Sequence, residues 1–67
     1  MIDYSRSAIE GAIDEWILNE KYRCIMKRRL IDGITYERLA EEFDMSVSQI
    51  KRIVYKSEER IFKHLHN

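Results

Sequence analysis

The feature that most constrains this chain is a pair of helix-start signals that flank a short turn in residues 35–54. Thr35 and Ser46 are residue types that favour the N-cap position, because their hydroxyl oxygens accept hydrogen bonds from the free amides of a first helical turn. Gln49 follows Ser46 at the spacing of a capping box, in which each side chain accepts from the other residue's backbone amide. The stretch therefore predicts two consecutive helices whose starts are fixed by local sequence.

Apolar residues flank both start signals at the two positions of a hydrophobic staple. Ile34 and Leu39 hold these positions around the first signal, and Met45 and Ile50 hold them around the second. We expect Asp44, in the turn between the helices, to adopt the left-handed backbone conformation, which few residues other than glycine visit. The staples and the turn together predict a fixed angle between the two helices.

The rest of the chain also has apolar residues three and four apart, no strand-type alternation and no proline. We therefore expect an all-α fold, a single small four-helix domain over residues 1–67. An extra N-terminal helix is expected at about 7–18, started by a capping box from Ser7 to Glu10. The fourth helix is expected to run from about 47 to 65.

The second helix is expected to begin after Asn19 as its N-cap and to end near Ile31. Gly33 then supplies the left-handed residue that commonly closes a helix. Cys24 lies within the apolar pattern of this helix, which predicts a packing role. We expect the buried stripe of the helix to consist of Tyr22, Ile25, Met26 and Leu30.

Four further positions carry specific expectations. Trp16 is the only tryptophan, and we expect it to anchor the core, with a subunit interface as the alternative. His64 and His66 lie two residues apart, a spacing that does not place two ligands on one helix face, so we expect terminal surface residues. Ala40 is predicted to lie where the two central helices cross, since a larger side chain would force them apart.

Charge is unevenly distributed along the chain, although the formal net charge is zero. Residues 1–20 and 34–45 are acidic, whereas residues 21–33 and 46–67 are basic. A neutral total argues against a general polyanion binder. It can still conceal a basic face if the two basic segments meet in the folded protein.

The sequence contains no pattern typical of an enzyme. It lacks a Ser/His/acid set, a glycine-rich phosphate loop and an HExxH motif, so we expect no catalysis, no cofactor and no metal site. No apolar run approaches the roughly 20 residues of a transmembrane helix, and the N-terminus lacks the features of a signal peptide. We therefore expect a cytoplasmic protein without a membrane partner.

Two helices joined by a three-residue turn, the second of them basic, form the helix-turn-helix pattern of DNA-binding proteins. We expect this unit at residues 35–56. Short side chains at the start of the second helix allow close approach to the major groove, and Lys and Arg reach bases or phosphates. The expected DNA-facing residues are Val47, Ser48, Gln49, Lys51, Arg52, Tyr55 and Lys56. The alternative is that this face is an ordinary solvated helix surface.

Three residues carry a second interpretation. Gln49 can contact adenine, but its capping-box role competes with that contact. Arg28 and Arg29 end the second helix, where cations stabilise the negative end of the helix dipole. Phosphate contact by these two arginines is an equally supported interpretation, and we include both among the expected DNA-binding residues.

The run RCIMKRRLIDGITYERLAEEFDMSVSQIKRIVYKSEERIFKHL, residues 23–65, resembles the region-4 domain of sigma-70-type RNA polymerase sigma factors. The arginine-rich helix and the motifs L..G.TY..LA, MS and S...IKR fall in the order and spacing of that family. The resemblance implies that residues 35–43 form a supporting helix and that residues 46–56 recognise the −35 promoter element.

Two departures from the family narrow this implication. The usual glycine of the turn is Asp44 here. Nothing in the chain resembles the sigma region that melts the −10 element, so we expect a free-standing small regulator of bacteria or phages and not a complete sigma factor.

The sequence therefore predicts a sequence-specific, DNA-binding transcription regulator that reads the major groove with helix 46–56. The alternative is a protein-interaction module that binds RNA polymerase or another regulator without binding DNA. A single unit of this kind with zero net charge should bind DNA weakly, so we expect a homodimer or a tether to polymerase. The candidate dimer surfaces are the first helix, with Trp16, and the end of the fourth, with Ile61, Phe62 and Leu65.

Overall fold

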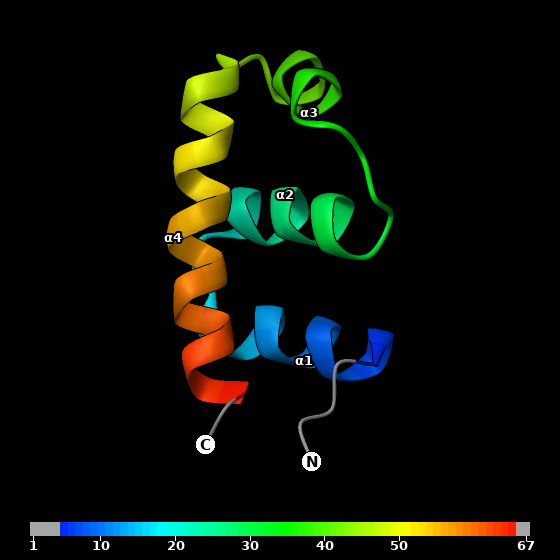
Figure 1. The fold of residues 1–67 in the computed structure, drawn as a ribbon, viewed down its shortest axis with the longest axis vertical. Coiled ribbons are helices and arrows are strands. Elements are labelled where there is room, and N and C mark those ends of the chain that lie inside the picture. The colour runs from blue at the N-terminus through cyan, green and yellow to red at the C-terminus, as the bar shows by residue number, and fades with distance from the viewer. Residues whose placement is uncertain (1–4, 66–67) are drawn as a thin grey trace.

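A computed structural model describes residues 5–65 of the chain, except for the side chain of Leu65. These residues form four α-helices and no strand: α1 (Arg6–Trp16), α2 (Glu20–Leu30), α3 (Tyr36–Phe43) and α4 (Val47–Leu65). The expected all-α fold with four helices is confirmed. Helices α1, α2 and α3 all lie on one side of α4, which is the longest helix, and each of them contacts it (Figure 1). The other side of α4 is therefore left open along its length.

Helix α1 begins earlier than expected, because Ser5 and not Ser7 is its N-cap. The Ser5 hydroxyl oxygen accepts from the Ala8 amide at 3.2 Å, and the Ser5 carbonyl accepts from the Ile9 amide at 3.0 Å. A start at Ser5 adds helical hydrogen bonds that a start at Ser7 would lose, so the longer helix prevails.

The end of α1 also differs from the expected limit at about residue 18. Ile17 is already extended, with φ −105° and ψ +106°. The guanidinium of Arg23 then donates to the carbonyls of Ile17 and Leu18, at 3.0 and 2.9 Å. Because a tertiary contact satisfies these carbonyls, the helix can end before the apolar pattern does.

The ends of α2 and the start of α3 lie where the capping residues predicted them. Asn19 accepts from the Tyr22 amide at 3.1 Å and Thr35 accepts from the Arg38 amide at 3.2 Å, so both expected N-caps are confirmed. Gly33 has φ +71°, the left-handed conformation expected after α2. The two helices are thus separated by a short segment with defined geometry.

The turn between α3 and α4 has the expected conformation. Asp44 is left-handed, with φ +54° and ψ +51°. The Gln49 amide donates to the Ser46 hydroxyl at 3.1 Å, and the Ser46 amide donates to the Gln49 side chain at 2.9 Å. The capping box is therefore complete, and it fixes the position where α4 begins.

The core lies between α4 and the other three helices. Ala40 is 9 % exposed within it, as expected for a small residue at the crossing of α3 and α4. Each large apolar side chain removed from water contributes on the order of 1.5–3 kcal/mol. The largest fully buried side chains are Ile13, Ile25, Met26, Leu39, Ile50, Val54 and Ile61.

Two predictions for α2 are wrong. Cys24 is exposed and does not pack in the core, and Tyr22 is 37 % exposed. The buried stripe is narrower than the apolar pattern suggested, because only Ile25 and Met26 of this helix are buried. Cys24 directly precedes that pair and points about 100° away from Ile25 around the helix.

The prediction for His64 is also wrong, since this residue is not a simple surface side chain. Its ring stacks on the indole of Trp16, with ring centroids 3.6 Å apart and planes inclined by 3°. Trp16 itself is half-buried and packs against the core. His66 lies outside the described residues.

Candidate nucleic-acid interface

The first half of α4 presents most of the expected DNA-facing residues to solvent. The opposite face of this segment, with Ile50, Ile53 and Val54, is buried, which fixes the rotation of the helix about its axis. Val47 differs from the expectation, because it is half-buried and packs against the core. The exposed members are Ser48, Gln49, Lys51, Arg52, Tyr55 and Lys56.

Gln49 is exposed but is engaged by the capping box. Its side-chain oxygen accepts from the Ser46 amide at 2.9 Å. Bidentate recognition of adenine needs both the oxygen and the nitrogen of this amide. In the observed conformation the cap therefore takes precedence, and a bidentate base contact would require its release.

A cluster of two cations and two aromatic rings joins α2, α3 and α4. The guanidinium carbon of Arg29 lies 4.1 Å from the ring centroid of Tyr36, and the Lys51 ammonium lies 5.7 Å from the same centroid. Tyr55 meets Tyr36 edge to face, with centroids 6.2 Å apart. Cations over aromatic faces are attracted by the ring quadrupole. This cluster is where the two basic segments of the chain meet.

Tyr36 was not among the residues predicted for this site. Tyr36 is the first residue of α3, and its seven-residue distance from Arg29 crosses a helix end and a turn. No helical periodicity links positions across such a break. An aromatic residue directly after an N-cap, close to a run of arginines, was the one available signal.

Arg28 points to a different partner, the acidic end of α3. Its Nε donates to Glu42 Oε2 at 3.1 Å, a second nitrogen bonds the other carboxylate oxygen, and Asp32 lies 3.5 Å from its Nη1. The hydrogen bond from Arg28 lowers the pKa of the Glu42 carboxyl below its ordinary value, and the same bond raises the pKa of Arg28. Arg28 therefore serves the junction of α2 and α3.

Other cations of α2 are also engaged within the fold. The Lys27 ammonium lies 2.7 Å from an Asp14 carboxylate oxygen, and this hydrogen bond raises the pKa of Lys27. Arg23 donates to the two carbonyls after α1. Even Arg29 donates to the Ile34 carbonyl at 3.0 Å, in addition to its contact with the Tyr36 ring.

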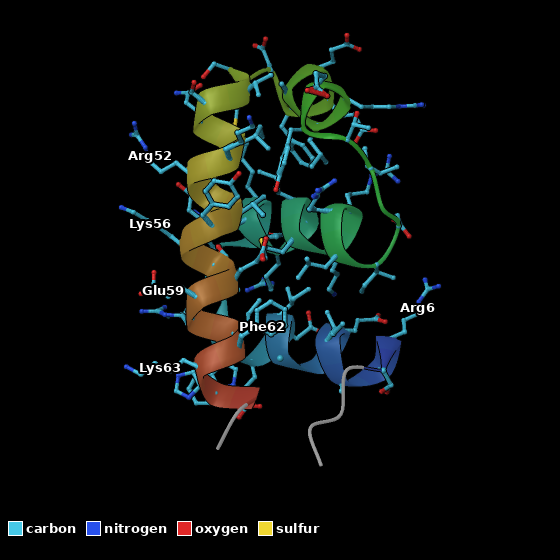
Figure 2. All side chains as sticks on the ribbon, in the orientation of Figure 1. Arg6, Arg52, Lys56, Glu59, Phe62 and Lys63 are labelled. Atoms are coloured by element: carbon cyan, nitrogen blue, oxygen red, sulfur yellow. The ribbon has the colours of Figure 1, made fainter. Side chains whose placement is uncertain are left out.

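The cations on the outer side of α4 are different. Arg52, Lys56 and Lys63 are exposed and form no ion pair within residues 5–65. Figure 2 shows them projecting from the side of α4 that faces away from the other helices. Arg60 is the exception, because it donates to the Trp16 carbonyl at 3.4 Å. The other three cations thus leave free positive charge along one face of α4.

A shallow groove of about 320 Å³ lies between the α1–α2 turn and α4. Leu18, beside it, is 81 % exposed. The residues that line the groove are Ile17, Leu18, Asn19, Tyr22, Lys56, Ser57 and Arg60.

Within the described part of the chain no three His, Cys, Asp or Glu residues gather as metal ligands.

The same described residues include no helix long and apolar enough to cross a membrane.

Comparisons with protein-family models, curated proteins and solved structures find no match to this chain. The similarity to sigma region 4 therefore stays a prediction that rests on the motifs of residues 23–65.

Proposed function

We propose that this chain is a sequence-specific transcription regulator that binds double-stranded DNA, with residues 46–56 in the major groove. One observation carries the proposal. The exposed face at the start of α4 holds cations that no acid within the described residues neutralises, while its opposite face is locked in the core. Unpaired cations on a rigid helix are available for phosphates and base edges.

The shape of this face also suits a duplex. The B-DNA major groove, about 12 Å wide, admits one α-helix. Ser48 is short and lies near the helix start, so the backbone can approach the base edges there. Lys51 and Arg52 follow within one turn and are long enough to reach guanine or the flanking phosphates. We propose a helix-turn-helix of the sigma region-4 type, in which α3 supports α4.

Affinity from one such unit should be modest and should fall with salt, because a neutral chain gains little long-range attraction. Three of the four apolar residues considered for a dimer are used within the chain, and the side chain of the fourth, Leu65, lies outside the described structure. Ile61 is fully buried, and Trp16 and Phe62 pack against the core. We therefore propose RNA polymerase, in preference to a second copy, as the source of additional binding energy at a promoter.

The test is fluorescence anisotropy with duplexes selected from random DNA by the wild-type protein. Reversal of both charges, Lys51→Glu with Arg52→Glu, should weaken binding at least about tenfold. Arg6→Glu, which reverses one charge, is the control at a distant site, since Arg6 is an exposed cation at the far end of α1 (Figure 2). Equal affinities for the reversed variant and the wild type would contradict the proposal.

The second candidate is a protein-interaction module without DNA binding. The exposure of Leu18 and Tyr22 beside the groove favours it, because large apolar and aromatic side chains are common at protein interfaces. This function predicts that wild-type protein enriches no duplex from random DNA, binds purified RNA polymerase, and loses that binding in Leu18→Asp.

A further inference from the structure

Four charged side chains form a ridge along the open side of α4, and the base-contacting segment accounts for only its first part. The members are Arg52, Lys56, Glu59 and Lys63, which are all exposed. Their spacings of four, three and four residues keep them on one face of a helix. Figure 2 shows all four extending from the same side of α4, away from the other three helices.

The ridge continues well past the residues proposed to contact bases. Arg52 and Lys63 are eleven positions apart, which is about 16 Å along a helix axis. That length matches about five base pairs at the 3.4 Å spacing of phosphates along one strand. A duplex that lay beside the whole ridge would meet phosphates beyond the segment that enters the groove.

Nothing in the described fold blocks such an approach. Helices α1, α2 and α3 pack against the other side of α4 (Figure 1). Phe62, on that packed side, points toward α1 and leaves the ridge to polar residues (Figure 2). Among the described residues, the open side of α4 is therefore accessible from Arg52 to Lys63.

We infer that α4 docks lengthwise along duplex DNA, with Lys56 contacting a phosphate at the end of the base-contacting segment and Lys63 contacting a phosphate beyond it. This inference rests on the proposed DNA-binding function and specifies its docking geometry. The other geometry is end-on insertion, in which only the first turns of α4 reach the DNA. In that case Glu59 and Lys63 would point away from the duplex.

A substitution of Glu59 distinguishes lengthwise docking from end-on insertion most clearly. It lies between Lys56 and Lys63 on the ridge, so lengthwise docking holds its carboxylate near phosphates of the same charge. Replacement by glutamine should then strengthen binding, up to about fivefold for two unit charges 4 Å apart in water. End-on insertion predicts no gain.

The experiment is a salt titration of binding to a labelled duplex selected by the wild-type protein, between about 50 and 200 mM salt. Lengthwise docking predicts that Lys63→Gln lowers the slope of log affinity against log salt by about 1. Lys63→Arg should restore that slope, because it keeps the charge. Glu59→Gln should bind more tightly than the wild type, with a gain that shrinks as salt rises.

Arg6→Gln and Glu10→Gln are the matched controls, because both residues are exposed on α1 and change charge by the same amounts. If Lys63→Gln and Glu59→Gln behave like these controls while charge reversal at Lys51 and Arg52 abolishes binding, lengthwise docking is wrong and the proposed function stands. If the wild-type protein binds no duplex, both are wrong.

Discussion

Two basic regions of this protein, α2 and the outer side of α4, use their charge differently. Lys27 and Arg28 of α2 form ion pairs with carboxylates of α1 and α3. Lys56 and Lys63 of α4 make no ion pair within the described residues. Both regions count as basic in the sequence, but these two cations of α2 are paired within the fold, whereas those two cations of α4 are available to a partner.

The difference follows from the packing. Helix α2 touches α1, α3 and α4, and the acidic segments of the chain supply carboxylates to α2 at the first two of these contacts. Helix α4 has one open side, and within residues 5–65 no carboxylate from another element forms an ion pair with its cations. The net charge of zero reflects 12 basic and 12 acidic residues, and it coexists with a basic face on α4 because part of the acid is paired with cations of α2.

The largest expected effect tests the helix crossing that orients α4. Ala40→Leu should lower the free energy of unfolding by about 1–3 kcal/mol, because added methyl groups overpack the contact between α3 and α4. Chemical denaturation measures this change. Glu41→Leu is the matched control, since Glu41 is the exposed neighbour and a surface change is expected to stay within about 0.5 kcal/mol. Equal stabilities of the two variants would mean that the helices do not cross at Ala40.

The next effect concerns the capping box that starts α4. Ser46→Ala removes the oxygen that accepts from the Gln49 amide, and loss of such a cap costs about 0.5–2 kcal/mol. Ser48→Ala, two residues away and exposed, should leave the unfolding free energy nearly unchanged. If the two serine variants unfold at the same denaturant concentration, the cap does not stabilise the start of α4.

The smallest expected effect is a pH-dependent change in melting temperature, which distinguishes Arg28 of α2 from Arg52 of α4. Arg28→Gln should lower the melting temperature at neutral pH, because it removes the partner of Glu42. Since the folded protein lowers the pKa of Glu42, this stabilisation is present above the ordinary glutamate pKa and is lost as pH falls through the lowered value. The melting curves of Arg28→Gln and the wild type should therefore converge in acid.

Arg52→Gln is the control for that pH series, because Arg52 has no acidic partner within the described residues. Its melting temperature should match the wild type at every pH. A constant difference between Arg28→Gln and the wild type down to strongly acidic pH would show that the pair with Glu42 is not the cause.

Local signals in the sequence predicted the parts of the fold that depend on neighbouring residues. The N-caps Asn19 and Thr35, the left-handed Asp44 and the capping box at Ser46 all form as expected. Each depends on contacts within four residues, which a sequence displays directly. The start of α1 was missed because two serines competed for one cap.

Contacts between distant residues could not be predicted in the same way. The pair Arg28–Glu42 spans fourteen positions, and the stack of Trp16 on His64 joins α1 to the end of α4. Both depend on how the helices pack, and that is set by the whole core. For the candidate interface, the sequence indicated the exposed residues of α4 apart from Val47, which is half-buried, but not that Arg28 is engaged elsewhere.

The most direct measurement compares two double variants that remove equal charge from the two regions. DNA affinity should fall at least about tenfold for Lys51→Gln with Arg52→Gln, while the melting temperature of this variant stays close to that of the wild type. Lys27→Gln with Arg28→Gln should show the reverse, a lower melting temperature and, at temperatures where it is folded, the affinity of the wild type. Equal losses of affinity in both variants would contradict the distinction between a neutralised α2 and a free α4.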